Sequence, residues 1–252
     1  MGQKLLAFDV GNSRLKVAIF DGEEMVLRES LQFVADWQAL AQELKARFSQ
    51  ADRPDRCLIA SVVRGAGEAI GRAVDSVWKL SSVVVDTQMD LGINVAVPRP
   101  DYVGIDRLLE ASEAFHIVRD CVVVVAFGSA ITVDLVTDNG VFRGGAILPG
   151  LRMGLRSLHG ETSLLPDVAL ETPLSALGTD TTSCIQSGVI YGSAGAVDRL
   201  CGELVPQGSF VLVLTGGDAE FMAPFIQTPC QIEPDLVLRG LASQDRRLLS
   251  GD

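Results

Sequence analysis

Residues 5–20 read Leu-Leu-Ala-Phe-Asp-Val-Gly-Asn-Ser-Arg-Leu-Lys-Val-Ala-Ile-Phe, two apolar runs around a short polar centre. The first run is continuous, which is typical of a strand that is buried on both faces. The second run alternates between apolar residues and smaller or polar ones, which is typical of a strand with one buried face. Gly11 and Asn12 tolerate positive φ, so we expect a tight turn between the strands. The stretch therefore predicts a hairpin with Asp9 at the end of its buried strand.

The polar centre of this hairpin, from Asp9 to Arg14, suits a phosphate-binding turn. Successive backbone N–H groups can cradle a phosphate, and a carboxylate beside them can hold a hydrated Mg²⁺ that carries it. The same residues also suit an ordinary hairpin in which the Asp only forms the turn. Because short motifs have low specificity, this stretch alone leaves both interpretations open.

A second stretch repeats the pattern of the first. Residues 122–136 again contain a continuous apolar run, a Gly-Ser turn and a second apolar run, at an offset close to half the chain. Gly128 aligns with Gly11, and Ser129 aligns with Asn12. Two related lobes that each carry a phosphate-type turn predict a nucleotide held in a cleft between them.

The two copies differ at one position and share a further turn. Ala126 stands where the first copy has Asp9, so the second copy lacks the carboxylate. Each hairpin runs into a second turn signal, Asp21-Gly22 in the first copy and Asn139-Gly140 in the second. Asp-Gly and Asn-Gly are strong signals for a hairpin turn, so we expect a third strand in each copy.

The composition bounds the class of protein. The 252 residues suffice for one large domain or two modest ones, and 48% hydrophobic residues with few aromatics fit an aliphatic α/β protein. A net charge of −11 argues against a nucleic acid or an anionic membrane as partner, because either would need a basic surface. Five widely spaced cysteines without a C-x-x-C pair, and two histidines, indicate a reduced, cytoplasmic protein without a histidine-rich metal site.

We expect no leader and no membrane segment. The N-terminus has no basic region followed by a long apolar stretch, as a signal peptide would. The longest apolar run, residues 121–127, is too short to span a bilayer.

The remaining pattern predicts an α/β fold in which each half opens with a three-stranded meander and continues with alternating strands and helices. The first lobe is expected to cover residues 1–118 and the second lobe residues 119–252. We expect strands at 24–30, 57–63, 82–86, 121–127, 131–137, 141–148 and 210–214, and helices at 36–48, 68–78, 104–115, 150–159, 179–205 and 235–249.

Two further stretches place polar residues where a helix is expected to start. Asp106 and Arg107 fall in the first turn of the helix near residue 104. The helix dipole alone favours a carboxylate there, but Asp106 could also be a general base for a substrate hydroxyl, with Arg107 pairing with a substrate anion. Thr215-Gly216-Gly217-Asp218 follows a strand, where its glycines suit either a tight turn or the approach of a phosphate or flat group.

Other polar residues have a simple structural interpretation. Asp180 and Thr181 are expected to cap the long helix that follows them. The arginines at positions 152, 156, 246 and 247 are expected to be solvated.

Taken in order, these motifs resemble the type III pantothenate kinase family, part of the superfamily of sugar kinases, Hsp70 and actin. Asp9-Val-Gly-Asn12-Ser13-x-x-Lys16 is similar to the family's D-x-G-N-T-x-x-K phosphate loop, and Gly104-Ile-Asp106-Arg107 matches its G-x-D-R motif. Further segments that follow the family's order are 129–134 (G-T-A-x-T-x-D), 144–150 (G-G-x-I-x-P-G), Thr181, Gly188, 215–217 and 234–240.

The resemblance implies two ribonuclease-H-like lobes, a homodimer that completes the substrate site, and ATP as co-substrate with Mg²⁺. The implied reaction moves the γ-phosphoryl group of ATP to the 4′-hydroxyl of pantothenate, the first step of coenzyme A biosynthesis, with Asp106 accepting the hydroxyl proton. The residues implied for ATP are Asp9, Val10, Gly11, Asn12, Ser13, Arg14, Leu15, Lys16 and Ser129. Those implied for pantothenate are Val97, Gly104, Ile105, Asp106, Arg107 and Thr181, the last of them from the partner subunit.

The chain departs from the family's pattern at two positions. Ala126 replaces the carboxylate expected to bind an activating monovalent cation, K⁺ or NH₄⁺, so the resemblance implies that this cation site is lost or weakened. Val97 stands where the family often has an aromatic residue. Two alternatives therefore stay open: an inactive member that serves as a binding or regulatory protein, like the Bvg accessory factor, or a kinase for another small hydroxyl substrate.

Overall fold

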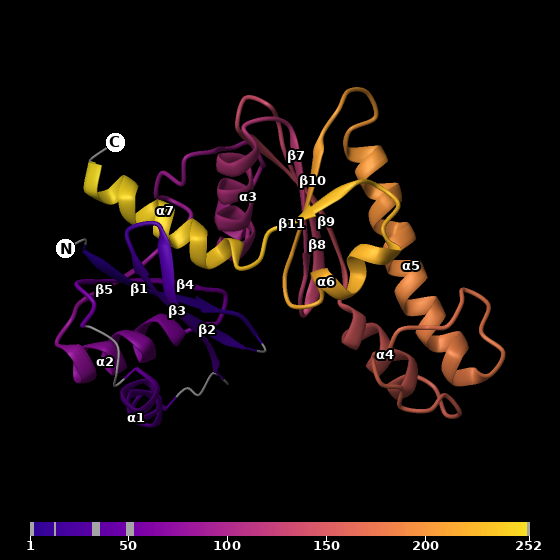
Figure 1. The fold of residues 1–252 in the computed structure, drawn as a ribbon, viewed down its shortest axis with the longest axis horizontal. Helices are drawn as coiled ribbons and strands as arrows, with labels where there is room; N and C mark the ends of the chain where they lie inside the picture. The colour runs from indigo at the N-terminus through magenta and orange to yellow at the C-terminus, as the bar shows by residue number, and fades with distance from the viewer. Residues whose placement is uncertain (1–2, 13, 32–35, 49–52, 251–252) are drawn as a thin grey trace. The chain divides into compact units, whose positions relative to one another are not determined.

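The computed structural model describes residues 3–12, 14–31, 36–48 and 53–250, so that Ser13 of the first turn lies outside the described residues. Within it the chain divides into two compact units (Figure 1). Unit 1 comprises Met1–Gly92, Arg99–Glu113 and Leu236–Asp252, and unit 2 comprises Ile93–Pro98 and Ala114–Asp235. None of the described helices has both the length and the apolar character needed to cross a membrane.

Unit 1 is built on a five-stranded sheet of β1 (Lys4–Val10), β2 (Leu15–Asp21), β3 (Glu24–Leu31), β4 (Arg56–Ser61) and β5 (Ser82–Val84). The order across the sheet is β3-β2-β1-β4-β5. β1, β2 and β3 form an antiparallel meander, and β4 and β5 run parallel to β1. The hairpin expected from residues 5–20 is therefore confirmed, with Val10 paired to Leu15 at its closed end.

Unit 2 repeats this sheet with β7 (Val122–Phe127), β8 (Ala130–Val136), β9 (Val141–Pro149), β10 (Val211–Thr215) and β11 (Cys230–Ile232). The first three strands are antiparallel neighbours, and β10 and β11 are parallel to β7, so the order and the directions match those of unit 1. A short strand, β6 (Asn94–Val95), adds to the outer edge along β9. The duplicated, ribonuclease-H-like α/β fold expected from the sequence is confirmed.

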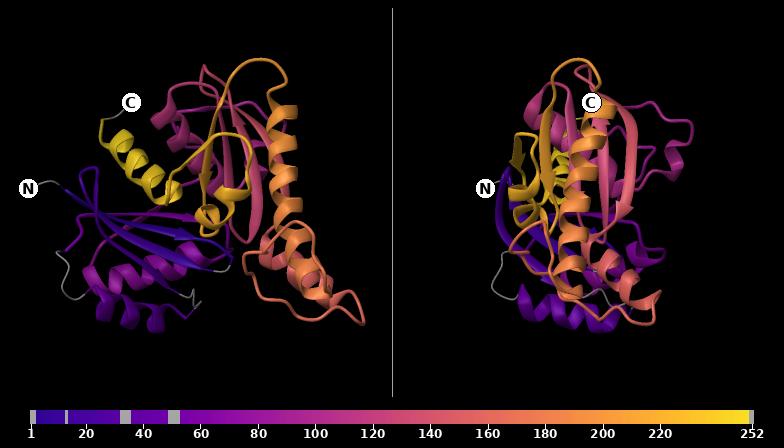
Figure 2. Two further views of the ribbon diagram at one scale, coloured as in Figure 1. Left: turned by 45° about the vertical axis from the view of Figure 1, so that its right-hand side comes forward. Right: turned by 90° about the vertical axis from the view of Figure 1, so that its right-hand side faces the viewer.

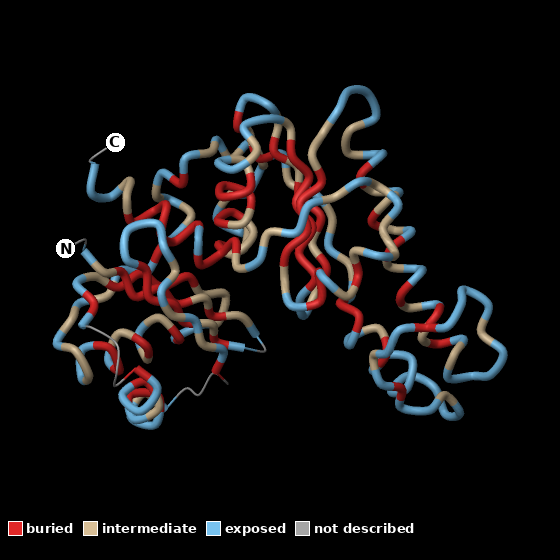
Figure 3. Tube along the Cα trace, in the orientation of Figure 1, coloured by how far each residue is buried: buried red, intermediate tan, exposed pale blue. Residues whose placement is uncertain are grey.

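The continuous apolar runs of β1 and β7 arise because both faces of each strand are buried. In β1, Leu6 and Phe8 belong to the core beneath α1 (Trp37–Arg47) and α2 (Ala66–Trp78). Leu5 and Ala7 on the other face are also buried, where α7 (Leu236–Ser250) packs against β1, β2 and β4. Figure 2 shows these helices on opposite sides of the sheet, and Figure 3 shows the buried residues concentrated along the central strands.

In unit 2 the sheet packs against α5 (Thr181–Leu204), which inserts Ile190, Ala194 and Val197 into the core. α4 (Leu151–Gly160) follows β9 directly, and α6 (Ala219–Met222) with the short helix η2 (Ala223–Phe225) follows β10. α3 (Ile105–Val118) and the short helix η1 (Pro100–Tyr102) complete the list of helices.

Several local expectations are confirmed by the backbone. Gly22 and Gly140 take positive φ values of 65° and 74°, as the Asp-Gly and Asn-Gly turns require. The carboxylate of Asp36 accepts a hydrogen bond from the N–H of Gln38 and so caps α1.

The C-terminal helix lies in unit 1, although the sequence offers no signal for this placement. The expected division at residues 118 and 119 assigns residues 236–252 to the second lobe, whereas α7 contacts the sheet of unit 1. Its polar side is buried as well: Asp245 forms an ion pair with Arg56 of β4.

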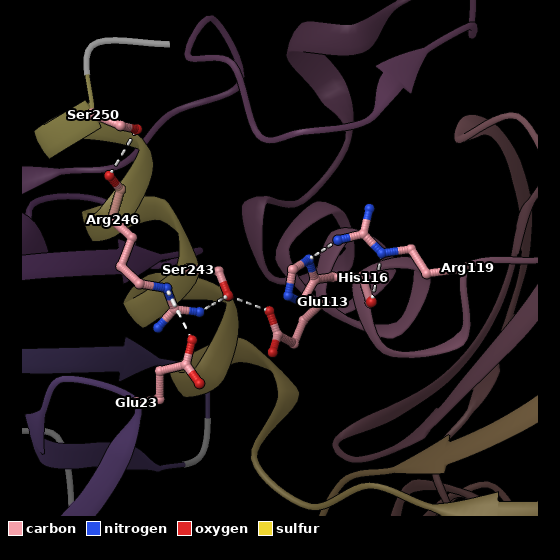
Figure 4. A network of polar contacts seen from close by, with 7 residues as sticks. All are labelled: Glu23, Glu113, His116, Arg119, Ser243, Arg246 and Ser250. Atoms are coloured by element: carbon pink, nitrogen blue, oxygen red, sulfur yellow. Dashed lines mark hydrogen bonds and ion pairs between the residues drawn. The ribbon is translucent and has the colours of Figure 1, made fainter.

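A polar network joins α7 to α3 within unit 1 (Figure 4). The hydroxyl of Ser243 donates to the buried carboxylate of Glu113 at 2.5 Å and accepts from Nη2 of Arg246 at 2.9 Å. Arg246 also lies 3.8 Å from Glu23. The expectation that Arg246 is simply solvated is therefore wrong, because its guanidinium is held by two partners.

Gly145 of β9 has no room for a side chain. A Cβ there would lie less than 3.0 Å from backbone atoms of Val133 and Asp134 on β8. We expect Gly145→Ala to lower the free energy of unfolding by about 3 kcal/mol, the upper end of the cost of overpacking, because backbone must move. Denaturant unfolding measures this change.

Gly202 provides the matched control for that substitution. It lies exposed on α5, and a Cβ there would meet nothing within 4 Å. We expect Gly202→Ala to be neutral or to stabilise by about 0.5–1 kcal/mol, since Ala is the better helix former. Equal destabilisation by the two substitutions would contradict the packing argument.

Candidate active site

The turn of the first hairpin, after β1, is closed by its own backbone. The N–H of Gly11 donates to the carbonyl oxygen of Arg14 at 3.0 Å. The expected tight turn is therefore present, although neither Gly11 nor Asn12 has a positive φ. A Cβ on Gly11 would meet only the Arg14 carbonyl oxygen, at an ordinary 3.6 Å. Among the described residues, neither positive φ nor close packing accounts for the glycine at this position.

Asp9 and Lys16 face each other at the base of this turn. They are directly opposite in the register of β1 and β2, and Lys16 Nζ lies 3.8 Å from Asp9 Oδ2. Their side chains are 13% exposed for Asp9 and 23% exposed for Lys16. Both groups are thus partly shielded from water yet accessible, where an ammonium can meet phosphate oxygens and a carboxylate can meet Mg²⁺.

The other expected ATP residues of this hairpin divide into two groups. The side chains of Val10 and Leu15 belong to the hydrophobic core, so only their backbone could contact a nucleotide. Asn12 and Arg14 are exposed on the turn. The turn therefore has backbone groups and polar side chains that a nucleotide could contact, while its apolar residues pack into the hydrophobic core.

The second cluster of site residues lies at the start of α3, also in unit 1. Gly104 precedes the helix and its carbonyl oxygen accepts from the N–H of Leu108 at 3.3 Å. The carboxylate of Asp106 turns back onto the first turn, where its Oδ1 accepts from the N–H of Arg107 at 2.8 Å. Ile105 is buried, whereas Asp106 and Arg107 are half-buried. The helix start thus presents a carboxylate beside a guanidinium.

Burial acts on the acidity of Asp106. Desolvation raises the pKa of the carboxyl group above its ordinary value, and the N–H of Arg107, the Arg107 charge and the N–H of Asp106 itself oppose this rise more weakly. A carboxylate with a raised pKa is a better proton acceptor than an ordinary Asp. The direction of this shift suits the expected role of Asp106 as a general base.

Val62, a residue that the sequence did not single out, lies between the two clusters. Its N–H donates to the carbonyl oxygen of Val10 at 3.2 Å, at the start of the first turn. Its Cγ1 lies 3.6 Å from the position that a Cβ on Gly104 would occupy. The segment after β4 therefore contacts both the first turn and the start of α3, which brings Asp9 and Asp106 to one end of the same sheet.

The turn of the second hairpin, in unit 2, reproduces the first. The N–H of Gly128 donates to the carbonyl oxygen of Ala130 at 3.0 Å, and a Cβ on Gly128 would meet only that oxygen, at 3.6 Å. Ser129 is exposed at the tip. A Cβ on Gly150, at the start of α4, would lie less than 3.0 Å from the backbone of Gly128 and Ser129. Gly128 in the turn therefore has room for a methyl group, whereas Gly150, which packs against the turn, has none.

The Thr-Gly-Gly-Asp segment after β10 supports this second turn from another side. Gly216 has a φ of 92°, and a Cβ on it would lie less than 3.0 Å from the Phe127 backbone. The N–H of Asp218 donates to the carbonyl oxygen of Phe127 at 3.1 Å. The glycines expected to suit a tight turn or a ligand thus have a packing role at position 216.

Arg152 on the first turn of α4 is 57% exposed, as expected of a solvated arginine, and it also forms an ion pair. Its Nη1 lies 2.6 Å and 2.8 Å from the two carboxylate oxygens of Asp218, whose side chain is 11% exposed. The pair ties α4 to the segment that supports the second turn. A sequence offers no signal for it because 66 residues separate the partners.

Ala126 occupies the place that Asp9 holds in unit 1. It is paired with Thr132 across β7 and β8, as Asp9 is paired with Lys16 across β1 and β2. Ala126 is 8% exposed and carries no ligand atom. The second turn therefore lacks both members of the ion pair found at the first.

Thr181 lies at the first turn of α5, but it does not cap the helix. Asp180 accepts from the N–H of Ser183 at 3.0 Å, and the Ser183 hydroxyl accepts from the N–H of Asp180 at 3.1 Å, a reciprocal capping box. Thr181 is exposed and lines a cavity of about 570 Å³ with Asp180, Cys184, Ile185 and Gly188.

Val97 has a structural contact. Val97 Cγ1 lies 3.4 Å from the position that a Cβ on Gly144 would occupy, so Val97 packs next to this glycine of β9. Gly144 itself has a φ of 85°. Val97 and Thr181 thus belong to unit 2 with Ser129, whereas all the described site residues of the first turn and of 104–107 belong to unit 1.

Comparison with known proteins agrees with this geometry. Residues 5–203 match the family model described as type III pantothenate kinase. The type III pantothenate kinase of Paramagnetospirillum magneticum is 34% identical over 96% of this chain and 97% of its own length.

Solved structures bear on the fold alone. A putative Baf family transcriptional activator from Campylobacter jejuni has a TM-score of 0.65 at 19% identity, covering 97% of this chain and 99% of its own. MreB 5 of Spiroplasma citri has a TM-score of 0.54 at 9% identity, covering 100% of this chain and 98% of its own. With the family model matched over most of the sequence, the chain belongs to the type III pantothenate kinase family.

Proposed function

We propose that this chain transfers the γ-phosphoryl group of ATP to the 4′-hydroxyl of pantothenate, with Asp106 as the general base. Its family makes it a phosphotransferase of coenzyme A biosynthesis, and pantothenate is the acceptor that this membership supports. The observation that carries the assignment of roles is the contact of Val62 with both the first turn and the start of α3.

The proposed roles follow from the chemistry of each group. Lys16 and the backbone of residues 10–14 meet the phosphates of ATP, where positive charge and N–H donors neutralise the developing charge of the transferred group. Asp106 takes the proton of the hydroxyl as the new P–O bond forms. Arg107 pairs with the carboxylate of pantothenate, and Ser129 adds a donor to the nucleotide from the second turn.

The residues at the first turn fit Mg²⁺ that arrives with ATP. Mg²⁺ is usually held by one or two carboxylates together with substrate phosphates, and Asp9 offers one partly exposed carboxylate. Among the described residues, no group of three His, Cys, Asp or Glu side chains gathers as a closed metal site. A bound Mg²⁺ would neutralise phosphate charge, and Asp9 would orient it.

Ala126 supplies no carboxylate that could bind a monovalent cation. We therefore expect Ala126→Asp to make stability and turnover respond to K⁺. Because the site is 8% exposed, an unpaired carboxylate there should lower the free energy of unfolding by about 2 kcal/mol or more in the absence of K⁺. K⁺ should then raise the thermal midpoint and the turnover of Ala126→Asp more than those of the wild type.

Ala126→Asn is the control, because Asn has nearly the size of Asp but no negative charge. It should be destabilised but should not gain a K⁺ response, because its side chain carries no formal charge. Identical effects of K⁺ on Ala126→Asp, Ala126→Asn and wild type would count against a cation site at this position.

We also propose that the protein acts as a homodimer, with Thr181 reaching pantothenate bound to the partner subunit. Exposed apolar side chains support an interface: Leu164 is 92% exposed, and Leu174 and Leu177 are largely exposed in the loop between α4 and α5, which also contributes Leu165 and Gly178 to the 570 Å³ cavity. Sedimentation of the purified protein measures the oligomeric state directly. A monomer that turns over at micromolar concentration would remove the shared site.

Cys184 provides a test of the pantothenate site at Thr181. It is the exposed cysteine of the five, and burial raises the pKa of Cys57, Cys121, Cys201 and Cys230. We expect iodoacetamide to modify Cys184 first, because the thiolate is the nucleophile and this sulfur is accessible. Saturating pantothenate should slow that modification but not the slower one at Cys230, as read by peptide mass spectrometry. If saturating pantothenate leaves the labelling rate of Cys184 unchanged, pantothenate binds at a site away from Thr181.

We place the protein in the cytoplasm, in keeping with its metabolic family and its five free thiols. Ala126 favours the regulatory alternative, but this alternative is not better supported than the kinase, since Asp9, Lys16, Asp106 and Arg107 are all present.

A panel of acceptors tests the identity of the substrate. ATP and Mg²⁺ are incubated with pantothenate, with its analogue lacking the 4′-hydroxyl, and with sugars, and phosphorylated products are identified by mass. We expect 4′-phosphopantothenate alone. Phosphorylation of a sugar but not of pantothenate would support a kinase for another hydroxyl substrate.

A further inference from the structure

The glycine that precedes α3 occupies an unusual position relative to Asp106. A Cβ on Gly104 would lie less than 3.0 Å from Oδ1 of Asp106, the oxygen that accepts from the N–H of Arg107. The next nearest atoms are Cγ of the same carboxylate at 3.5 Å and Val62 Cγ1 at 3.6 Å, both at ordinary contact distances. Apart from this one carboxylate, the site has room for a methyl group.

The backbone does not explain the glycine either. Gly104 is not among the residues with positive φ, so alanine could adopt its conformation without strain. Its carbonyl oxygen accepts the first hydrogen bond of α3, and alanine preserves that bond. Among the described residues, the Asp106 side chain is thus the obstacle to a larger residue at position 104, and the turn conformation is not.

We propose that Gly104 is a positioning residue, which holds the Asp106 carboxylate against the first turn of α3 by leaving the space that the carboxylate fills. The inference rests on the proposed role of Asp106 as general base. Val62, whose N–H donates to Val10 at the first turn, lies next to the same space. A methyl group at position 104 displaces the carboxylate by rotation about its own side-chain bonds, without moving the backbone.

The displacement has two measurable consequences. Misplacing a catalytic group by about 1 Å costs on the order of 100-fold in rate, so kcat of Gly104→Ala should fall about that far while the KM for ATP stays unchanged. The pKa of the Asp106 carboxyl should also fall toward its ordinary value, because burial is the main cause that raises it. That pKa is read by NMR of ¹³C-labelled aspartate, with Asp106→Asn assigning the signal.

A double-variant comparison separates positioning from direct substrate contact. If Gly104 acts through Asp106, adding Gly104→Ala to Asp106→Ala should cost nothing further in kcat. If Gly104 instead contacts pantothenate, the substitution should raise the KM for pantothenate in both backgrounds, and the proposal is then wrong. Gly202→Ala is the matched control, since it adds the same methyl group to an open site and should leave the NMR signal and kinetics unchanged.

The remaining outcomes also decide the question. Should Gly104→Ala fail to fold while Gly104→Ala with Asp106→Ala folds, the carboxylate is the obstacle and the proposal stands. If both fail to fold, or if Gly104→Ala leaves the Asp106 pKa unchanged, the proposal is overturned. The NMR comparison needs no turnover, so it tests the role of Gly104 even in an inactive protein. A wild-type protein without pantothenate-dependent activity would refute the proposed function, and the NMR comparison would still decide this inference.

Discussion

Asp106→Asn should leave the fold intact and lower kcat by about 10²–10⁴-fold, the usual contribution of a general acid or base. The amide can still accept the hydrogen bond from the N–H of Arg107, but it cannot take a proton from the hydroxyl of the substrate. The wild type should lose turnover as pH falls through the Asp106 pKa, which burial raises above the ordinary value. Asp106→Asn should lack this limb of the pH–rate profile.

The stability of the same variant separates the catalytic role from helix stabilisation. Because the pKa of Asp106 is raised in the folded state, its protonated form stabilises the fold. This contribution to stability is present at low pH and is lost as pH rises through the folded-state pKa, where the carboxyl group ionises. At neutral pH, Asp106→Asn should therefore unfold at the same or a higher temperature. If the helix dipole were the reason for the carboxylate, the variant should instead lose about 0.3–1 kcal/mol and keep its turnover.

Asp101→Asn is the matched control for these measurements. Asp101 lies five positions earlier on η1, where its side chain is 56% exposed and pairs with Arg99 at 3.7 Å. An exposed pair of this kind contributes little to stability. We expect wild-type turnover and an unchanged pH profile, so a comparable loss in Asp101→Asn would point to a general effect of removing acidic charge.

Lys16→Met should lower kcat by about 10²–10³-fold, the range for losing one preorganised electrostatic contact to a transition state. Met preserves the length of the side chain and its packing between the strands, so the lost charge is the main change. Because Asp9 loses a partner at 3.8 Å, a modest fall in thermal midpoint is expected as well. Steady-state kinetics with varied ATP, at a temperature where the variant is folded, measures the effect.

Lys45→Met provides the comparison for Lys16→Met. Lys45 is exposed in the last turn of α1, a helix that contributes none of the residues implied for ATP or pantothenate. It should keep wild-type kcat and KM for ATP. Equal losses in the two variants, or near-normal turnover of Lys16→Met, would remove Lys16 from the phosphate site.

The parts of the fold that the sequence predicted depend on local patterns. The continuous apolar runs that became β1 and β7 and the Asp-Gly and Asn-Gly turns each report on neighbours a few residues away. The duplication was visible for the same reason. β6 was missed because two residues are too few to show a period.

The parts that the sequence did not predict depend on distant contacts. Arg152 finds Asp218 across 66 residues, and α7 packs on a sheet whose strands lie near the other end of the chain. The turn at Gly11 closes without positive φ, a backbone detail that residue type alone does not predict. The role proposed for Gly104 depends on the Cβ that glycine lacks. It can be inferred only from where the structure places the Asp106 carboxylate.

The measurement that tests the central claim most directly is ADP release by the purified protein with ATP and Mg²⁺, with and without pantothenate, and with Asp106→Asn in parallel. We expect release that depends on pantothenate, is nearly abolished in Asp106→Asn, and responds little to K⁺ because Ala126 has no ligand atom. No pantothenate-dependent release from a folded wild-type protein would contradict the proposed reaction. Release that Asp106→Asn fully retains would contradict the role of Asp106.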